Sequence, residues 1–292
     1  MLRLLVTGGT SGIGAALVRE SLRAGHSVFT TGRDPGKMAA LLDACAGLGR
    51  VGGVVADAGD WEQTSAAVLA AHEFLGGIDV AVANAGFSAA GDLANGDPGR
   101  WRDMVLTNVY GPAVLAKAAL PQLMENRGHM VLIGSTAGRK VYPGNLYTAT
   151  KWAVTGYAES LRQQLVGTGV RVLHIAPGHV HTPLWKEAPD AIIPPETVAG
   201  TMLWALSQPP GVDVSEVMVR ATGQAFQRAV SGVKLASLNG THQPCRFSLS
   251  GKKGGGKHGT QNGRLRPRDR AAAVSFWTGS PRRHGQPRGA QA

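Results

Sequence analysis

A glycine-rich turn directly after a short apolar segment constrains the fold of this chain more than any other feature. The apolar residues Leu2–Val6 are followed by Thr7-Gly8-Gly9-Thr10-Ser11-Gly12-Ile13-Gly14. Glycines allow a tight turn from strand to helix, and they let the backbone approach a pyrophosphate that the helix N-terminus stabilises. The pattern therefore predicts a dinucleotide site, although an unliganded turn could share it. The residues expected at the dinucleotide are Gly8, Thr10, Ser11, Gly12, Ile13 and Gly14.

Segments with strand and helix patterns alternate along residues 1–224. Strands are expected at Leu2–Val6, Ser27–Thr31, Val51–Ala56, Ile78–Ala83, His129–Ile133, Val170–Ile175 and Val214–Ala221. Helices are expected at Ile13–Ala24, Lys37–Ala46, Asp60–Leu75, Arg100–Leu120 (with a bend near Gly111-Pro112), Tyr147–Val166 and Pro195–Ser207. Strict alternation predicts an α/β fold, a Rossmann-type doubly wound parallel sheet sandwiched by helices.

The formal net charge of +11 comes from the C-terminal part of the chain. Residues 225–292 hold 13 of the 30 lysines and arginines and one acidic residue, whereas residues 1–224 hold 17 basic and 18 acidic residues. Low-complexity runs and few periodic apolar residues predict a disordered basic tail at 225–292, after a single domain at 1–224. Such a tail could bind RNA, DNA or anionic lipid, but composition alone predicts only disorder, and the domain itself carries no signal for nucleic acid.

The chain has no stretch of 18 or more apolar residues, so no membrane-spanning segment is expected. The apolar N-terminal residues run straight into the glycine turn, which indicates a first strand rather than a signal peptide and favours a cytoplasmic protein. Cys45 and Cys245 lack the spacing of a metal site or a disulfide framework, and we expect free thiols. His179 and His181 have no nearby cysteine or acid pair, so no metal site is expected.

The residues after the second and third strands bear on the choice of coenzyme. Arg33 follows the second strand, and its guanidinium suits the 2′-phosphate of NADP(H), which we expect to be preferred over NAD(H). Asp34 comes next and could cap a helix or pair with Arg33. Asp57 is placed to contact the adenine or to cap the following turn. Small residues in Asn84-Ala85-Gly86 let the chain pass close to the coenzyme, and Asn84 could brace neighbouring strands.

A tyrosine and a lysine four residues apart share one face of a predicted helix. They are Tyr147 and Lys151, and Ser135 comes twelve residues before the tyrosine. An ammonium favours the phenolate, so we expect Lys151 to lower the tyrosine pKa from its ordinary value of about 10. A general acid or base beside a bound dinucleotide predicts proton transfer that accompanies hydride transfer.

In their order and spacing, these motifs resemble the short-chain dehydrogenase/reductase family, in its shorter branch. The resemblance covers residues 1–224 and includes Asn108 and the run Pro177-Gly178-His179-Val180-His181-Thr182. Ala83 departs from it, because many members have a second asparagine there, but that position is structural. The resemblance implies a catalytic set of Asn108, Ser135, Tyr147 and Lys151.

The resemblance also implies a role for each of these residues. Tyr147 exchanges a proton with the substrate oxygen, and Ser135 hydrogen-bonds that oxygen. Lys151 lowers the tyrosine pKa and binds the nicotinamide ribose, and Asn108 holds a water on the proton path to Lys151. The backbone of Val180 and the side chain of Thr182 contact the carboxamide. The coenzyme contacts beyond the glycine turn are Arg33, Asp57, Asn84, Ala85, Gly86, Tyr147, Lys151, Pro177, Gly178, Val180 and Thr182.

Within the family, the chain is most similar to the NADP-dependent 3-hydroxy acid (serine) dehydrogenases. The shared features are Ile133-Gly134-Ser135-Thr136-Ala137-Gly138 and the segment Glu216–Gln224. We therefore expect an oxidoreductase that acts on the CH–OH group of a secondary alcohol, with a 3-hydroxy acid as candidate substrate. Pro183–Ile193, the segment that lids the substrate, is short. Lys186, or Arg139 and Lys140, could hold a substrate carboxylate or could simply be solvated.

Two further interpretations stay open. A ketoreductase for acyl or polyketide-type carbonyls would use the same catalytic residues on another substrate. A non-catalytic NADP(H)-binding sensor or scaffold would not need the intact catalytic set. By resemblance we also expect a homo-oligomer, a dimer or tetramer, assembled through the helices Arg100–Leu120 and Tyr147–Val166. The other expected partner is a small-molecule carbonyl or alcohol substrate.

Overall fold

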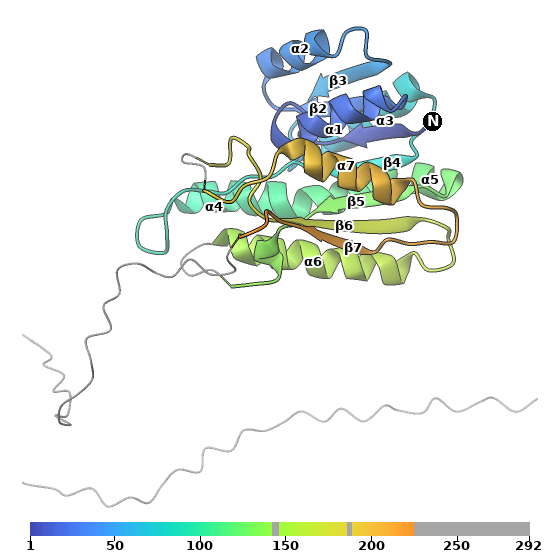
Figure 1. Ribbon diagram of the computed structural model, residues 1–292. Coiled ribbons are helices and arrows are strands. Elements are labelled where there is room, and N and C mark those ends of the chain that lie inside the picture. Colours follow the sequence, from blue (N-terminus) through green and yellow to red (C-terminus); the bar gives the residue numbers. More distant parts are fainter. Residues whose placement is uncertain (142–145, 186–188, 225–292) are drawn as a thin grey trace, which may run out of the picture. The chain divides into compact units, whose positions relative to one another are not determined.

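The computed structural model describes residues 1–141, 146–185 and 189–224 (Figure 1). The predicted tail at 225–292 lies outside the described residues, and so do Cys245 and Lys186. The strands are β1 (Arg3–Val6), β2 (Ser27–Gly32), β3 (Val51–Val55), β4 (Val80–Ala83), β5 (His129–Ile133), β6 (Arg171–Pro177) and β7 (Glu216–Val219). The helices are α1 (Gly12–Arg23), α2 (Pro35–Ala44), α3 (Trp61–Leu75), α4 (Pro98–Val105), α5 (Gly111–Asn126), α6 (Leu146–Gln164) and α7 (Pro195–Leu206), with a π-helical turn η1 (Leu106–Tyr110) and a 3₁₀ turn η2 (Thr136–Gly138).

The strands form one parallel sheet in the order β3-β2-β1-β4-β5-β6-β7. The chain first builds outward from β1 to β3 and then crosses back to place β4 on the other side of β1. The predicted doubly wound parallel sheet is therefore confirmed. Ligands of such sheets bind beyond the carboxyl ends of the strands, at the point where the strand order reverses. In this chain that point lies between β1 and β4, next to the glycine turn.

Helices cover both faces of the sheet and produce two apolar clusters. Leu4 and Leu5 are neighbours in β1 yet belong to different clusters, because successive side chains of a strand point to opposite faces. Leu17 of α1 and Met202 of α7 pack in the first cluster, and Leu115 of α5 packs in the second. Burial on both faces explains why the central strands β1, β4 and β5 are mostly apolar rather than alternating.

The single long helix predicted at Arg100–Leu120 is divided into α4, η1 and α5. The division falls just before the predicted bend at Gly111-Pro112. Gly111 passes so close to the loop after β3 that an added Cβ would lie 2.8 Å from the Ala58 carbonyl oxygen. A π-helical turn inserts one residue into the helical repeat, which changes the direction of the side chains around it. Asn108 lies in this turn and is buried.

Other boundaries differ by a few residues from those that the sequence predicts. Helix α2 begins at Pro35 rather than Lys37, because Asp34 caps it and a proline is well tolerated in the first turn. The last strand is shorter than predicted, covering Glu216–Val219. Cys45 is a buried free thiol, as predicted. Among the described residues, no helix is long and apolar enough to cross a membrane.

Candidate active site

The glycine turn joins β1 to α1 with backbone torsions that glycine adopts readily. Gly8 has a φ of +67° and Gly12 a φ of +52°, in the left-handed region where other residues are strained. A Cβ on Gly14 would lie 2.5 Å from Asn84 Nδ2 and closer still to the Gly8 carbonyl oxygen. Ser11 is the N-cap of α1, but its hydroxyl makes no capping hydrogen bond. The turn is therefore compact, and Ser11 does not occupy the N–H groups that open α1.

Asn84, directly after β4, ties the glycine turn to the neighbouring strand. Its Nδ2 donates hydrogen bonds to the carbonyl oxygens of Thr7 at 2.9 Å and Gly8 at 3.0 Å. The Thr7 hydroxyl accepts hydrogen bonds from the backbone N–H groups of Asn84 and Ala85, both at 3.2 Å. A Cβ on Gly8 would lie 2.8 Å from Ala85 Cα, so the two segments are in close contact. Asn84 thus braces β1 and β4, while its direct contact with a coenzyme stays a prediction.

Arg33 follows β2 and presents a guanidinium whose side chain is 53% exposed. Its Nη1 is 3.8 Å from Asp57 Oδ2, and its Cζ is 5.8 Å from the centroid of the Phe87 ring. Asp34 acts as the cap of α2, where its Oδ1 accepts a hydrogen bond from the Lys37 N–H at 3.0 Å. An exposed ion pair at 3.8 Å is weak, so the guanidinium can turn toward an anionic ligand.

Two residues near Arg33 were not singled out by the sequence. The Cζ of Arg100, at the start of α4, lies 4.8 Å from the centroid of the Phe87 ring. Arg33 approaches the same ring from the end of β2, so two cations from distant segments converge there. No local motif links these positions, and only the fold reveals the convergence.

Asp57, beside Arg33, also has the turn-capping role, since its Oδ1 accepts a hydrogen bond from the Gly59 N–H at 2.8 Å.

Ser135 and Tyr147 meet at the carboxyl end of β5. Ser135 directly follows the strand and caps η2, where its Oγ accepts a hydrogen bond from the Ala137 N–H at 3.0 Å. Its side chain is also hydrogen-bonded to that of Tyr147, which lies in the first turn of α6. The two hydroxyls predicted to contact a substrate oxygen are therefore adjacent in the fold.

Lys151 lies one helical turn after Tyr147 and is only 6% exposed. Its Nζ donates a hydrogen bond to the Ile133 carbonyl oxygen at 2.9 Å and is 5.6 Å from the centroid of the Tyr147 ring. Burial lowers the pKa of Lys151 to about 8. Burial also raises the pKa of Tyr147 to about 12, and the hydrogen bond with Ser135 offsets only part of that rise. The pKa of Tyr147 thus moves opposite to the predicted direction, because desolvation of the phenolate dominates.

Asn108 is held by three hydrogen bonds of its side-chain amide. Its Oδ1 accepts from the Phe87 N–H at 3.0 Å, and its Nδ2 donates to the Phe87 carbonyl oxygen at 2.9 Å and to Thr150 Oγ1 at 3.1 Å. Thr150 Oγ1 in turn donates to the Tyr147 carbonyl oxygen at 2.7 Å. These bonds connect η1 to the start of α6. A Cβ on Gly86 would lie 3.1 Å from Asn108 Oδ1 and 3.7 Å from Lys151 Nζ, so Asn108 and Lys151 border the same space.

The segment after β6 lies across from the glycine turn. A Cβ on Gly12 would lie 3.0 Å from Thr182 Cγ2, which places Thr182 beside the predicted dinucleotide site. Gly178 donates a backbone hydrogen bond to the Val219 carbonyl oxygen at 2.7 Å. Val180 is buried and bridges to Ile193. The sheet thus brings this segment, the glycine turn and the Tyr147 helix to one edge, as such folds do for their ligands.

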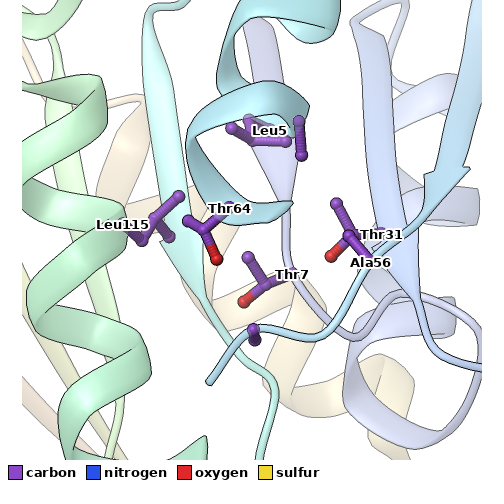
Figure 2. A pocket seen from close by; sticks show the side chains of 8 residues that line it. Leu5, Thr7, Thr31, Ala56, Thr64 and Leu115 are labelled. Atoms are coloured by element: carbon purple, nitrogen blue, oxygen red, sulfur yellow. The ribbon is translucent and has the colours of Figure 1, made fainter. Parts of the chain in front are cut away.

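Two hollows lie among the described residues near this edge of the sheet. The first, between β1, β2 and α3, is lined by residues that include Thr7, Thr31 and Thr64 (Figure 2). It has no room for a water molecule, so it is a packing gap rather than a ligand site. The second is an open depression of about 440 Å³ at the start of α7, lined by residues that include His181 and Glu196. It adjoins the segment predicted to cover the substrate.

Comparisons with known proteins agree with this geometry. The sequence model of the family described as short chain dehydrogenase matches residues 3–192. An uncharacterized oxidoreductase of Staphylococcus saprophyticus is 33% identical over 223 residues, covering 74% of this chain and 95% of that protein. The crystal structure of serine dehydrogenase from Escherichia coli has a TM-score of 0.68 and 30% identity, covering 76% of this chain and 99% of that one. The closed form of serine dehydrogenase complexed with NADP+ has a TM-score of 0.69 and 29% identity, covering 82% and 99%.

Proposed function

The chain belongs to the short-chain dehydrogenase family, and we propose that it is an NADP(H)-dependent oxidoreductase that interconverts a secondary alcohol and its carbonyl. The observation that carries the proposal is the convergence of Ser135, Tyr147 and Lys151 beside the glycine turn. The Ser135 and Tyr147 side chains are hydrogen-bonded, and Lys151 is buried one helical turn away. Three polar groups gathered at the ligand-binding edge of such a sheet favour chemistry over a purely structural role.

The residues of the glycine turn fit a dinucleotide. A side chain at Gly14 would collide with neighbouring atoms and one at Gly12 would be strained by its positive φ, so the turn brings backbone rather than side chains to this edge of the sheet. When bound, a nicotinamide coenzyme supplies or accepts the hydride, and the protein's task is to position and polarise. We infer that the N-terminus of α1 stabilises the pyrophosphate charge and that Thr182 borders the nicotinamide end.

In the direction of carbonyl reduction, Tyr147 donates its proton to the substrate oxygen while Ser135 hydrogen-bonds the same oxygen. A phenol whose pKa is about 12 is fully protonated at neutral pH and is ready to act as the acid. In the direction of alcohol oxidation the phenolate must form first, so that direction requires alkaline pH or a further positive charge nearby. The protonated Tyr147 of the free protein therefore suits the step of carbonyl reduction near neutral pH.

The preference for NADP(H) rests on Arg33. Its guanidinium is half exposed and its ion pair with Asp57 is a weak one at 3.8 Å, so a 2′-phosphate can form charge-assisted bonds with it. Asp34, the acid that follows Arg33, is engaged as the cap of α2. The likeness to a serine dehydrogenase complexed with NADP+ supports the same choice.

The substrate class is inferred from the relatives and from the cationic residues near Ser135. Likeness to serine dehydrogenases favours a 3-hydroxy acid. Arg139 is an unsuitable carboxylate anchor, because its Nε and Nη2 are both hydrogen-bonded to Glu216. Of the other two candidates, Lys186 lies outside the described residues, and Lys140 stays a prediction. A ketoreductase for acyl-type carbonyls is the second candidate function, favoured by the open depression beside His181.

We further propose a homo-oligomer and a cytoplasmic location. The helices predicted to form the interface carry exposed apolar side chains, among them Val105 and Tyr110 around η1 and Leu146 and Trp152 on α6. Exposed apolar groups gathered on adjoining helices are typical of subunit contacts. Sedimentation of the purified chain tests the assembly.

The decisive experiment for the reaction is oxidation of NADPH in the presence of 3-oxo acids, 3-oxo esters, diketones and aldehydes, with Tyr147→Phe as the control. Turnover that disappears in the variant, while NADPH binding is kept, supports the proposal. Turnover that persists in Tyr147→Phe refutes the role of the tyrosine. Binding of NADPH without turnover of any substrate would favour the interpretation as a non-catalytic sensor or scaffold.

A further inference from the structure

Glu216, the first residue of the edge strand β7, forms an ion pair with a residue of the Ser135 turn. Arg139 Nε donates a hydrogen bond to Glu216 Oε1 at 2.9 Å, and Arg139 Nη2 donates to Oε2. Two parallel bonds between a guanidinium and a carboxylate fix geometry better than a single contact. Arg139 is the residue immediately after η2, the 3₁₀ turn that Ser135 caps. The ion pair therefore fastens the far end of the Ser135 turn to β7.

The same carboxylate contacts a buried histidine on the other side of the turn. His174, on β6, is 2% exposed, and its Nδ1 lies 3.5 Å from Glu216 Oε1. Burial is the main reason that the pKa of His174 falls to about 4, so the ring is neutral and carries its proton on Nδ1, facing the carboxylate. Its Nε2 faces Gly134, where any Cβ would collide with it. Gly134 is the residue immediately before Ser135, so the histidine packs against the near end of the turn.

We propose that Glu216 is a positioning residue, which acts through Arg139 and His174 to hold Ser135 in hydrogen-bonding contact with Tyr147. The inference rests on the proposed function for its catalytic meaning. Its structural content, the coupling of β7 to the Ser135–Tyr147 contact, does not depend on turnover. The edge strand lies beside β6 and ends the sheet (Figure 1), so the placement of the catalytic serine depends on the docking of the last strand.

The proposal predicts a specific loss of function. Misplacing a reacting group by about an ångström can cost roughly a hundredfold in rate. We expect Glu216→Gln and Arg139→Ala each to lower kcat by about tenfold to a hundredfold, with little change in the Kd for NADPH. Because both variants break one ion pair, the double variant should lose no more than either single one. The charge-exchanged pair Arg139→Glu with Glu216→Arg should recover part of the activity.

A spectroscopic readout separates positioning from general destabilisation. The chain has four tyrosines, and the signal of Tyr147 in protein labelled with ¹³C at tyrosine Cζ is identified by its disappearance in Tyr147→Phe. Loss of the hydrogen bond in Ser135→Ala gives the reference shift. Glu216→Gln and Arg139→Ala should move the Tyr147 signal in the same direction as Ser135→Ala. This measurement at neutral pH requires no substrate, so it tests the inference even if the wild-type chain proves inactive and the proposed function fails.

The matched control is Asp79→Asn, which breaks another long-range ion pair. Arg3 donates hydrogen bonds from Nε and Nη2 to Asp79 at 3.0 and 2.7 Å, at the amino end of β1, far along the sheet from Ser135. This control should lower stability and leave the Tyr147 signal and kcat unchanged. If Glu216→Gln behaves like the control, Glu216 is only structural and the proposal is overturned. If Arg139→Ala raises only the KM for an acidic substrate and Glu216→Gln has no such effect, Arg139 is a carboxylate anchor and the proposal is likewise overturned.

Discussion

Replacing Arg33 by alanine tests the coenzyme preference most directly. The guanidinium has one acidic partner, the Asp57 carboxylate at 3.8 Å, it lies 5.8 Å from the Phe87 ring centroid, and about half of the side chain is exposed. Breaking an exposed pair of this kind costs about 1 kcal/mol or less, so the fold should tolerate the change. A hydrogen bond to a charged group contributes about 1.5–3 kcal/mol, which corresponds to roughly tenfold to 150-fold in affinity. Exposure to solvent places the expected loss toward the lower end of that range.

In Arg33→Ala, kcat/KM should fall for NADPH and not for NADH. NADH has no 2′-phosphate, so its kcat/KM should stay within about twofold of the wild-type value while that of NADPH falls by about tenfold to thirtyfold. Arg33→Lys keeps the charge but not the fork of donors, and it should lie between the wild-type chain and the alanine variant. Arg23→Ala is the matched control, because Arg23 is 55% exposed and likewise has one acidic partner, Glu20.

The assay is kcat/KM for both coenzymes at fixed ionic strength, together with direct titration of each coenzyme by fluorescence. Screening weakens contacts between exposed charges, so the NADPH advantage should also shrink as salt is raised. A wild-type chain that prefers NADH would refute the proposed preference for NADPH. An equal loss for both coenzymes in Arg33→Ala would show that the arginine supports the fold of the site rather than the 2′-phosphate.

Two further predictions concern the glycine turn and the amino end of the sheet. Gly14→Ala should abolish tight NADPH binding and destabilise the chain by about 1–3 kcal/mol, because the new Cβ would lie 2.5 Å from Asn84 Nδ2. NADPH titration measures the first effect and urea unfolding the second. The control is Gly200→Ala, on a helix with open space around it, which should be neutral or slightly stabilising. In Asp79, burial raises the pKa, but the hydrogen bonds from Arg3 outweigh it and leave the pKa lowered. This carboxylate therefore stabilises the fold at pH values above its unfolded pKa, and the contribution is lost as the pH falls through its folded pKa. Asp79→Asn should lower the free energy of unfolding by about 1–3 kcal/mol at pH 7 and hardly at all near pH 2.

Much of this fold could be predicted because local patterns and global topology agree. Each predicted strand from Leu2–Val6 to Val214–Ala221 overlaps an observed one, and alternation with helices left a parallel sheet as the simple outcome. The glycine turn could also be predicted, since its backbone torsions favour glycine at positions 8 and 12. Ser135 could be placed at the ligand edge because it follows the carboxyl end of β5, and Tyr147 because it shares a helix face with Lys151 near the start of α6.

Features that depend on contacts between distant segments were not predictable in the same way. The division of the long helix at η1 follows from the close approach of Gly111 to the loop after β3. Glu216 and Arg139 belong to different elements, and nothing in either local sequence marks them as partners. The same is true of Arg33 and Arg100, which meet over one aromatic ring. Pairings of this kind become visible only when the sheet order is known.

The pKa of Tyr147 shows why a motif can identify the reacting residues and still mislead about their state. Spacing in Tyr147-x-x-x-Lys151 places an amine near a phenol, and charge alone would lower the pKa of the phenol. The fold buries both groups, and burial drives each toward its neutral form, to a pKa of about 12 for the tyrosine and about 8 for the lysine. The lysine is also turned toward the Ile133 carbonyl oxygen, and the phenol is left with the hydrogen bond to Ser135 as its main support against burial. Ser135 is therefore the side chain on which the acidity of Tyr147 depends in the free protein, and the residues that hold the Ser135 turn acquire a chemical role without contacting the substrate.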